Sequence, residues 1–126
     1  MRVLIMHTDN AKLQDSVGVL QKALEQESVK VDLVSPSGAG GSPVSTAPYS
    51  LVCVATEYTG WWKPQVPVEM DNLLTRATRL QGKKGVALVQ PGPLGSGKAL
   101  RVLMALMERQ GIMVEDFDTL GGEKEI

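Results

Sequence analysis

Cysteine and histidine are almost absent, since Cys53 and His7 are the only examples in a chain of 126 residues. A single cysteine excludes an intrachain disulfide and a cysteine-rich zinc site. Cys53 lies within a continuous apolar run, so we expect a buried, unreactive thiol. No Ser/His/Asp or Cys/His arrangement and no metal-ligand spacing accompanies His7. The sequence therefore predicts no catalytic residues and no metal site.

Long apolar runs and a strong net charge are also missing. No run approaches the roughly 20 residues that cross a bilayer, and residues 3–6 are too short for a signal-peptide core. The formal net charge of −1 gives no sign of a basic face for nucleic acid or an acidic membrane. We therefore expect a cytoplasmic protein without nucleic-acid or membrane partners. The length fits one domain, residues 1–126.

Short apolar runs alternate with amphipathic segments along the chain. Apolar residues recur at helical spacing in 11–26, in 66–80 before Gly82, and in 100–107 before Gly111. Residues 35–48 are rich in Gly, Ser and Pro, which predicts an irregular connection. Strands are expected at 3–6, 29–34, 51–55, 86–89 and 112–114. This alternation predicts an α/β domain whose five strands pair in parallel through right-handed crossovers.

Three loops should meet at the carboxyl edge of this sheet, where open α/β folds bind ligands. They span residues 7–10, 56–64 and 91–98. The middle loop holds both tryptophans, Trp61 and Trp62, together with Tyr58. Aromatic side chains there favour stacking on a planar ring. The alternative is that they cover the end of the core or a dimer contact.

The third loop is rich in glycine and leads into a helix N-terminus, which favours anions. It nearly matches the phosphate-binding pattern G-x-x-x-x-G-K-[ST] through Gly92, Gly97 and Lys98. Ala99, however, stands where the Mg²⁺-binding hydroxyl belongs. A glycine-rich turn is therefore favoured over a nucleoside-triphosphate site.

The order of elements and several motifs resemble the flavodoxin family. Residues 56–60, Thr-Glu-Tyr-Thr-Gly, are similar to the Pro-Thr-Tyr-x-Gly turn that follows the third flavodoxin strand. Residues 82–88 resemble the lead-in to the fourth strand. Residues 92–111 resemble the Gly-rich ring-side loop and helix of flavodoxins and of the flavodoxin domains of flavodiiron proteins. The resemblance implies a flavodoxin-like three-layer sandwich with strand order 2-1-3-4-5.

The same resemblance implies an FMN site. Tyr58 matches the family's aromatic position, and Trp61 or Trp62 would supply a second stacking face. The first loop would hold the phosphate. The implied cofactor-binding residues are Thr8, Asn10, Thr56, Glu57, Tyr58, Thr59, Gly60, Trp61, Gly92, Pro93, Leu94, Gly95 and Gly97.

Two departures from the family pattern affect the expected function. The first loop has no glycine and lacks the Ser/Thr-x-Thr-Gly-x-Thr phosphate motif, and Asp9 adds a negative charge there. Thr8, Asn10, Lys12 and the helix N-terminus are left to hold an anion. Residues 115–126 are acidic and show no apolar helical face, so a full last helix is not expected. The sheet face left bare predicts a homo-oligomer or a subunit of a complex, with residues 117–126 as a candidate swapped segment.

These observations lead to two functional hypotheses. The first is an FMN-binding electron-transfer protein that works with a redox partner protein. The second is a flavin-free flavodoxin-like subunit or protein-interaction module. Both hypotheses describe an electron carrier or a binding domain rather than a stand-alone enzyme. The fold does not decide between them, because function is set by the site.

Overall fold

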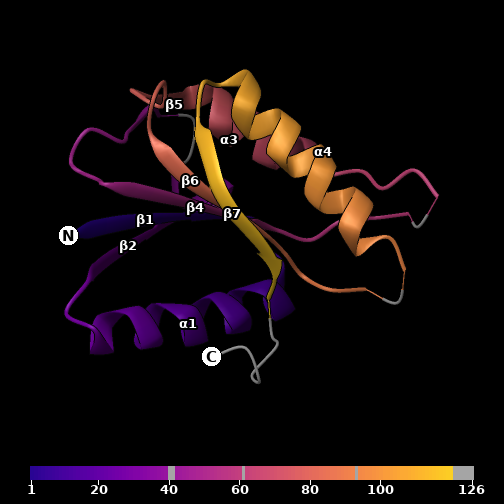
Figure 1. The fold of residues 1–126 in the computed structure, drawn as a ribbon, viewed down its shortest axis with the longest axis horizontal. Coiled ribbons are helices and arrows are strands. Elements are labelled where there is room, and N and C mark those ends of the chain that lie inside the picture. Colours follow the sequence, from indigo (N-terminus) through magenta and orange to yellow (C-terminus); the bar gives the residue numbers. More distant parts are fainter. Residues whose placement is uncertain (40–41, 61, 93, 121–126) are drawn as a thin grey trace.

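A parallel five-stranded sheet forms the centre of the molecule, with strand order β2-β1-β4-β6-β7 (Figure 1). The computed structural model describes residues 1–39, 42–60, 62–92 and 94–120. The elements are β1 (Arg2–His7), α1 (Ala11–Gln26), β2 (Lys30–Val34), α2 (Pro36–Ala39), β3 (Val44–Ser45), β4 (Leu51–Thr56), α3 (Val68–Arg76), β5 (Ala77–Thr78), β6 (Lys84–Val89), α4 (Ser96–Arg109) and β7 (Met113–Thr119). When only the five strands of this sheet are numbered along the chain, the order is 2-1-3-4-5, which confirms the prediction.

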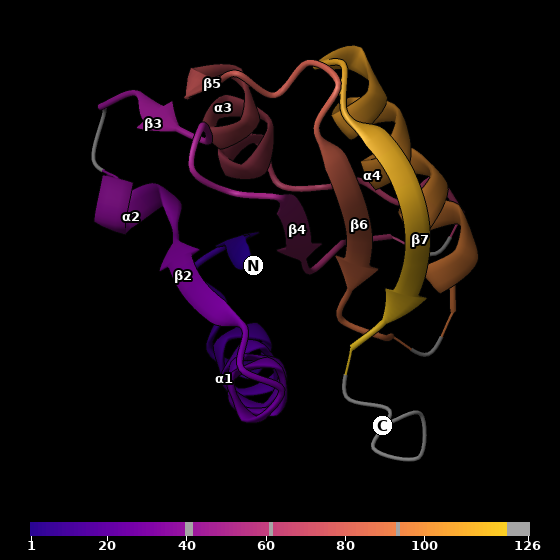
Figure 2. The same ribbon diagram turned by 60° about the vertical axis from the view of Figure 1, so that its left-hand side comes forward.

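The sheet has helices on both faces, with α1 on one side and α3 and α4 on the other (Figures 1 and 2). Alternate residues of β1 enter opposite layers, because neighbouring side chains of a strand point to opposite faces. Leu4 packs with residues of α3 and α4, whereas Ile5 packs with Leu13 and Val17 of α1. This arrangement is the expected three-layer sandwich.

Helix α3 is shorter than predicted. It ends at Arg76, and the next two residues, Ala77–Thr78, pair in parallel with Val44–Ser45 to form a separate two-stranded sheet. Both the backbone N–H and the hydroxyl of Thr46 donate to the carbonyl of Thr78. Leu80 is buried outside the helix, so its apolar character did not mark a helical turn. The connection predicted as irregular contains the single turn α2 and the strand β3.

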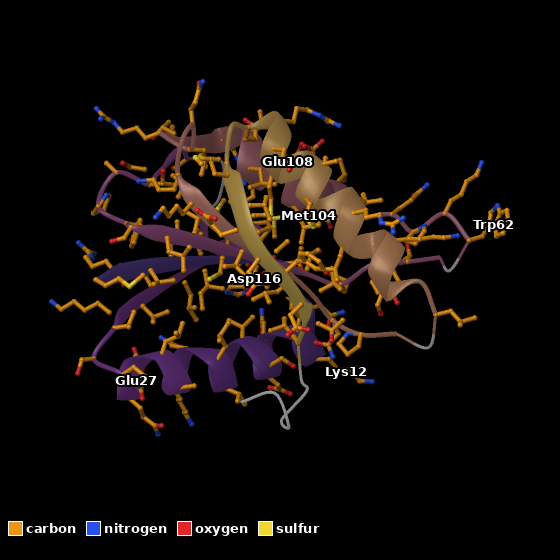
Figure 3. The ribbon with its side chains drawn as sticks, viewed as in Figure 1. Lys12, Glu27, Trp62, Met104, Glu108 and Asp116 are labelled. Carbon is orange, nitrogen blue, oxygen red and sulfur yellow. The ribbon has the colours of Figure 1, made fainter. Side chains whose placement is uncertain are left out.

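Strand β7 is longer than predicted. It runs through Met113–Thr119, and the register with β6 shifts between Gly85 and Val86. Asp116 pairs with Val86 and Asp118 with Leu88, so this edge strand carries charged side chains (Figure 3). Charges on an edge strand oppose unwanted pairing with other chains. Residues 115–119 of the acidic segment are therefore part of the sheet.

The sheet face beside α1 is less bare than predicted. Leu88 is 8% exposed, and Leu120 packs into the same apolar cluster as Leu13 and Val17. The positions of β7 that pair with the α1-side residues of β6 are acidic. The expected homo-oligomer stays a prediction, and part of the proposed swapped segment, 121–126, lies outside the described residues. Among the described helices, none combines the length and apolar composition needed to cross a membrane.

Cys53 provides a test of the packing beneath α1. Its side chain is buried in β4, and this burial raises the pKa of the thiol to about 11. Because the thiolate is the reactive form, the folded protein is expected to resist a thiol reagent at neutral pH and to react fully once unfolded in denaturant. Rapid labelling in the absence of denaturant would contradict the buried position.

Candidate functional site

Three loops converge at the carboxyl edge of the sheet, as predicted from the strand order. The ends of β1, β4 and β6 lie side by side, since His7 pairs with Ala55, and Ala55 with Leu88. The loops that leave β4 and β6 extend together beyond the sheet (Figure 1). An antiparallel bridge between Thr59 and Gln65 closes the middle loop on itself.

The first loop turns its polar groups into the protein. Thr8 is 3% exposed, and its hydroxyl donates to Oε1 of Glu57 in the middle loop. Asn10 caps α1, because its Oδ1 accepts the backbone N–H of Leu13 at 3.0 Å. Nδ1 of the buried His7 ring lies 2.9 Å from the carbonyl oxygen of Thr8.

The side chain of Asp9 contacts α2. Its carboxylate accepts the Ser37 hydroxyl at 2.8 Å and the Ser37 backbone N–H at 3.2 Å. These hydrogen bonds, the hydroxyl foremost, lower the pKa of Asp9 below its usual value. The carboxylate is therefore ionised at neutral pH and ties the first loop to the segment after β2.

Tyr58 joins the middle loop to the third loop. Its hydroxyl donates to the Leu94 carbonyl at 2.7 Å and lies 3.0 Å from Oγ of Ser96. Oγ of Ser96 also accepts the backbone N–H of Gly92 at 3.4 Å. A Cβ atom at residue 92 would stand 2.7 Å from the Tyr58 hydroxyl, so glycine is needed for this close approach. Gly95, at φ 92°, turns the chain into α4.

A cavity of about 330 Å³ lies between these two loops. Its size falls at the lower end of the range for ligand pockets. Five of the predicted residues line it, namely Glu57, Tyr58, Gly60, Gly92 and Leu94, together with Gln90 and Pro91. Gln90 was not predicted, although it is the first polar residue after β6 and thus has the position of a site residue. Its side chain accepts the Ser16 hydroxyl at 3.3 Å, which links the cavity to α1.

The other predicted site residues lie around the cavity or outside the described part. The hydroxyl of the buried Thr56 donates to the Glu57 carbonyl at 2.9 Å. Thr59 and Gly95 belong to the same two loops, and Gly97, predicted in the third loop, lies in the first turn of α4; none of the three is among the lining residues. Trp61 and Pro93 lie outside the described residues.

Trp62 occupies the outer end of the middle loop, away from the sheet (Figure 3). It is 64% exposed, and Nζ of Lys98 lies 5.0 Å from its ring centroid. A lysine over an indole face is a cation–π contact. Trp62 is not among the residues that line the cavity. Across the described residues, no three His, Cys, Asp or Glu side chains gather where they could hold a metal ion.

Comparison with solved structures shows a flavodoxin-like fold. Oxidised flavodoxin 1 from Bacillus cereus superposes with a TM-score of 0.71 at 13% identity, covering 99% of this chain and 88% of that one. Two-electron reduced flavodoxin from Megasphaera elsdenii gives 0.71 at 17% identity, with 93% and 84% covered. Flavodoxin from Fusobacterium nucleatum, solved bound to flavin mononucleotide, gives 0.60 at 12% identity, with 93% and 77% covered. No family model and no curated protein matches the sequence.

Proposed function

We propose that this chain binds FMN between its three carboxyl-edge loops and transfers electrons to a redox partner protein. The cavity between Tyr58 and Gly92 is the observation that carries this proposal. It lies where open α/β sheets bind their ligands, on a fold shared with flavodoxins. FMN would supply the redox chemistry, since it accepts and returns electrons one or two at a time, and the protein would hold it and tune its potential.

The ring end of FMN fits the residues that are present. Tyr58 offers an aromatic face, and the backbone at Gly60 and Gly92 carries no side chain that would keep a planar ring away. Glu57 adds a carboxylate to the lining. A negative charge beside the ring disfavours added electrons, so Glu57 would hold the potential of the flavin down.

The phosphate of FMN would be held by backbone N–H groups more than by side chains. Helix α1 spans 16 residues, and the first N–H groups of such a helix attract anions. Lys12, in its first turn, is exposed and adds a positive charge. The Thr8 hydroxyl and Asn10 Oδ1 already serve Glu57 and Leu13. Thr8 and Asn10 would therefore contact the phosphate only with their remaining hydrogen-bonding capacity.

In the first loop, the side chains of Thr8 and Asn10 already form hydrogen bonds within the protein. This supports the alternative function, a flavin-free subunit or protein-interaction module. A loop whose polar side chains are satisfied within the protein has less to offer a phosphate than the glycine-containing motif of the family. In that case the exposed Trp62 and Leu94 would contact a protein partner instead of bordering a flavin.

Flavin titration separates the two functions. If FMN binds, the fluorescence of the aromatic residues at the site should fall with micromolar FMN, and the bound flavin should give the purified protein a yellow colour. The control is riboflavin, which has the same ring but no phosphate and should bind more weakly. Unchanged fluorescence at saturating FMN would remove the electron-transfer proposal and leave the flavin-free alternative.

The Asp9 charge should oppose the phosphate. Replacing Asp9 with asparagine keeps an oxygen for Ser37 but removes the charge, so FMN affinity is expected to rise on the order of a few-fold at low ionic strength. The gain should shrink as salt is added. Asp15→Asn, on the exposed side of α1, is the matched control and should change affinity less. An equal gain in both variants would place the phosphate elsewhere.

A further inference from the structure

A second cavity lies at the opposite edge of the sheet, where β4 and β6 begin. Its volume is about 470 Å³, and its walls include the first residues of both strands, Leu51 and Lys84, which pair in register. The turn between β5 and β6, together with Met1, Tyr49 and Ser50, forms the rest of the wall. Because this cavity lies at the amino ends of the strands, it is distinct from the candidate flavin site at their carboxyl ends (Figure 1).

The lining of this amino-edge cavity is basic. Arg79, Lys83 and Lys84 contribute positive charges, Ser50 and Gln81 add neutral donors, and no acidic side chain is among the lining residues described. The chain as a whole is slightly acidic, with 14 Asp and Glu against 13 Lys and Arg. Cations gathered in one concave surface create a local positive potential that concentrates anions.

Nearby carboxylates do not neutralise these cations. Asp32 forms an ion pair with Arg2 at 3.0 Å and accepts the Tyr49 hydroxyl at 2.8 Å. Nζ of Lys83 is fixed by donating to the Tyr49 carbonyl at 2.9 Å. Within the described residues, none of the three lining cations is paired with a carboxylate. The cavity thus holds a positioned positive charge without an internal counter-ion.

Arg79 is held in an unfavourable backbone conformation. Its φ of 64° lies in the left-handed region, which glycine adopts freely and other residues rarely enter. Among the described residues other than glycine, only Ser28 shares this conformation; Ser28 directly follows the cap of α1, whereas Arg79 does not end a helix. Strained residues often mark functional sites. Here the strained position carries a guanidinium that lines the cavity.

We propose that the amino-edge cavity binds a small phosphate-bearing anion. The planar guanidinium of Arg79 can donate to two oxygens of one phosphate group. Lys83 and Lys84 would balance the remaining negative charge of the anion. A phosphate or diphosphate group carries more than one negative charge and so matches several cations better than a single carboxylate does. The slightly acidic whole chain favours a small molecule over a nucleic acid.

Titration with inorganic pyrophosphate, followed by the amide resonances of the full chain, tests this proposal. Binding should saturate, shift the amides of residues 50–51 and 79–84 together, and weaken as sodium chloride is added. Arg79→Gln should reduce the affinity at least 10-fold. Lys22→Gln, an exposed charge change on α1, should leave it unchanged. Non-saturating shifts spread over all lysines, or equal affinity in Arg79→Gln, would overturn the proposal.

A pair of glycine variants separates binding from folding. Arg79→Gly and Ser28→Gly both relieve a left-handed residue, so both should raise the melting temperature. Only Arg79→Gly should lose pyrophosphate binding. Retained binding in that well-folded variant would show that Arg79 does not contact the anion. FMN affinity should be the same in Arg79→Gln as in the unaltered chain, so failure of this site leaves the flavin proposal intact.

Discussion

FMN affinity is expected to fall about 10- to 100-fold when Tyr58 is replaced by alanine, because stacking of a planar ring on an aromatic side chain is worth about 1–3 kcal/mol. Tyr58 lines the cavity between the middle and third loops. The truncation also removes the hydrogen bonds that link these loops through Leu94 and Ser96. Fluorescence or calorimetric titration of the two proteins measures the difference.

Tyr58→Phe separates the ring from its hydroxyl. It keeps the aromatic face and loses the contacts at 2.7 and 3.0 Å, so a loss of only a few-fold is expected. Tyr49→Phe, at the other edge of the sheet, is a matched control that should not change FMN affinity. An alanine variant at residue 58 that binds FMN as tightly as the unaltered chain would mean that the ring does not stack there.

The free energy of unfolding is expected to fall by about 2–5 kcal/mol in Leu103→Ala. Leu103 is fully buried in α4 and belongs to the cluster that joins α3, α4 and the sheet. The loss combines the transfer free energy of the removed atoms with the cavity left behind. It would be a large share of the roughly 5–15 kcal/mol that stabilises a typical domain. Equilibrium denaturation in urea measures this change.

Leu33→Ala provides the control for that truncation. Leu33 lies on β2 and is 41% exposed, so the same chemical change should cost clearly less there. Equal losses in the two variants would contradict the assignment of Leu103 to the core. Because α4 carries the glycine-rich loop at its N-terminus, the Leu103 variant should also weaken FMN binding in partly denaturing conditions.

Local patterns in the sequence were sufficient to predict the central sheet and its main helices. The spacing of Leu13 and Val17 marks the buried side of α1, and Asn10 provides its cap. Long-range pairing was not visible in such patterns. Helix α3 stops at Arg76 because residues 77–78 pair with residues 44–45, more than thirty positions earlier in the chain. Strand β7 continues through acidic residues because an edge strand tolerates charge.

The candidate site was predicted in position more than in detail. Strand ends and glycines located the loops that carry Tyr58 and Gly92. The sequence could not show that Asp9 turns toward Ser37, or that Thr8 donates to Glu57, because both contacts join segments far apart in the chain. The link between Gln90 and Ser16 was not visible either, since it depends on how α1 packs against the end of β6.

The most direct test of the central claim is a titration of the full chain with FMN, followed residue by residue through its backbone amide resonances. Binding of one FMN per chain is expected to shift the amides of residues 8–12, 57–60, 90, 92 and 94–97 together. Saturable shifts confined to those carboxyl-edge loops are the result predicted by an FMN site. No shifts at saturating FMN, or shifts centred on another surface, would contradict it.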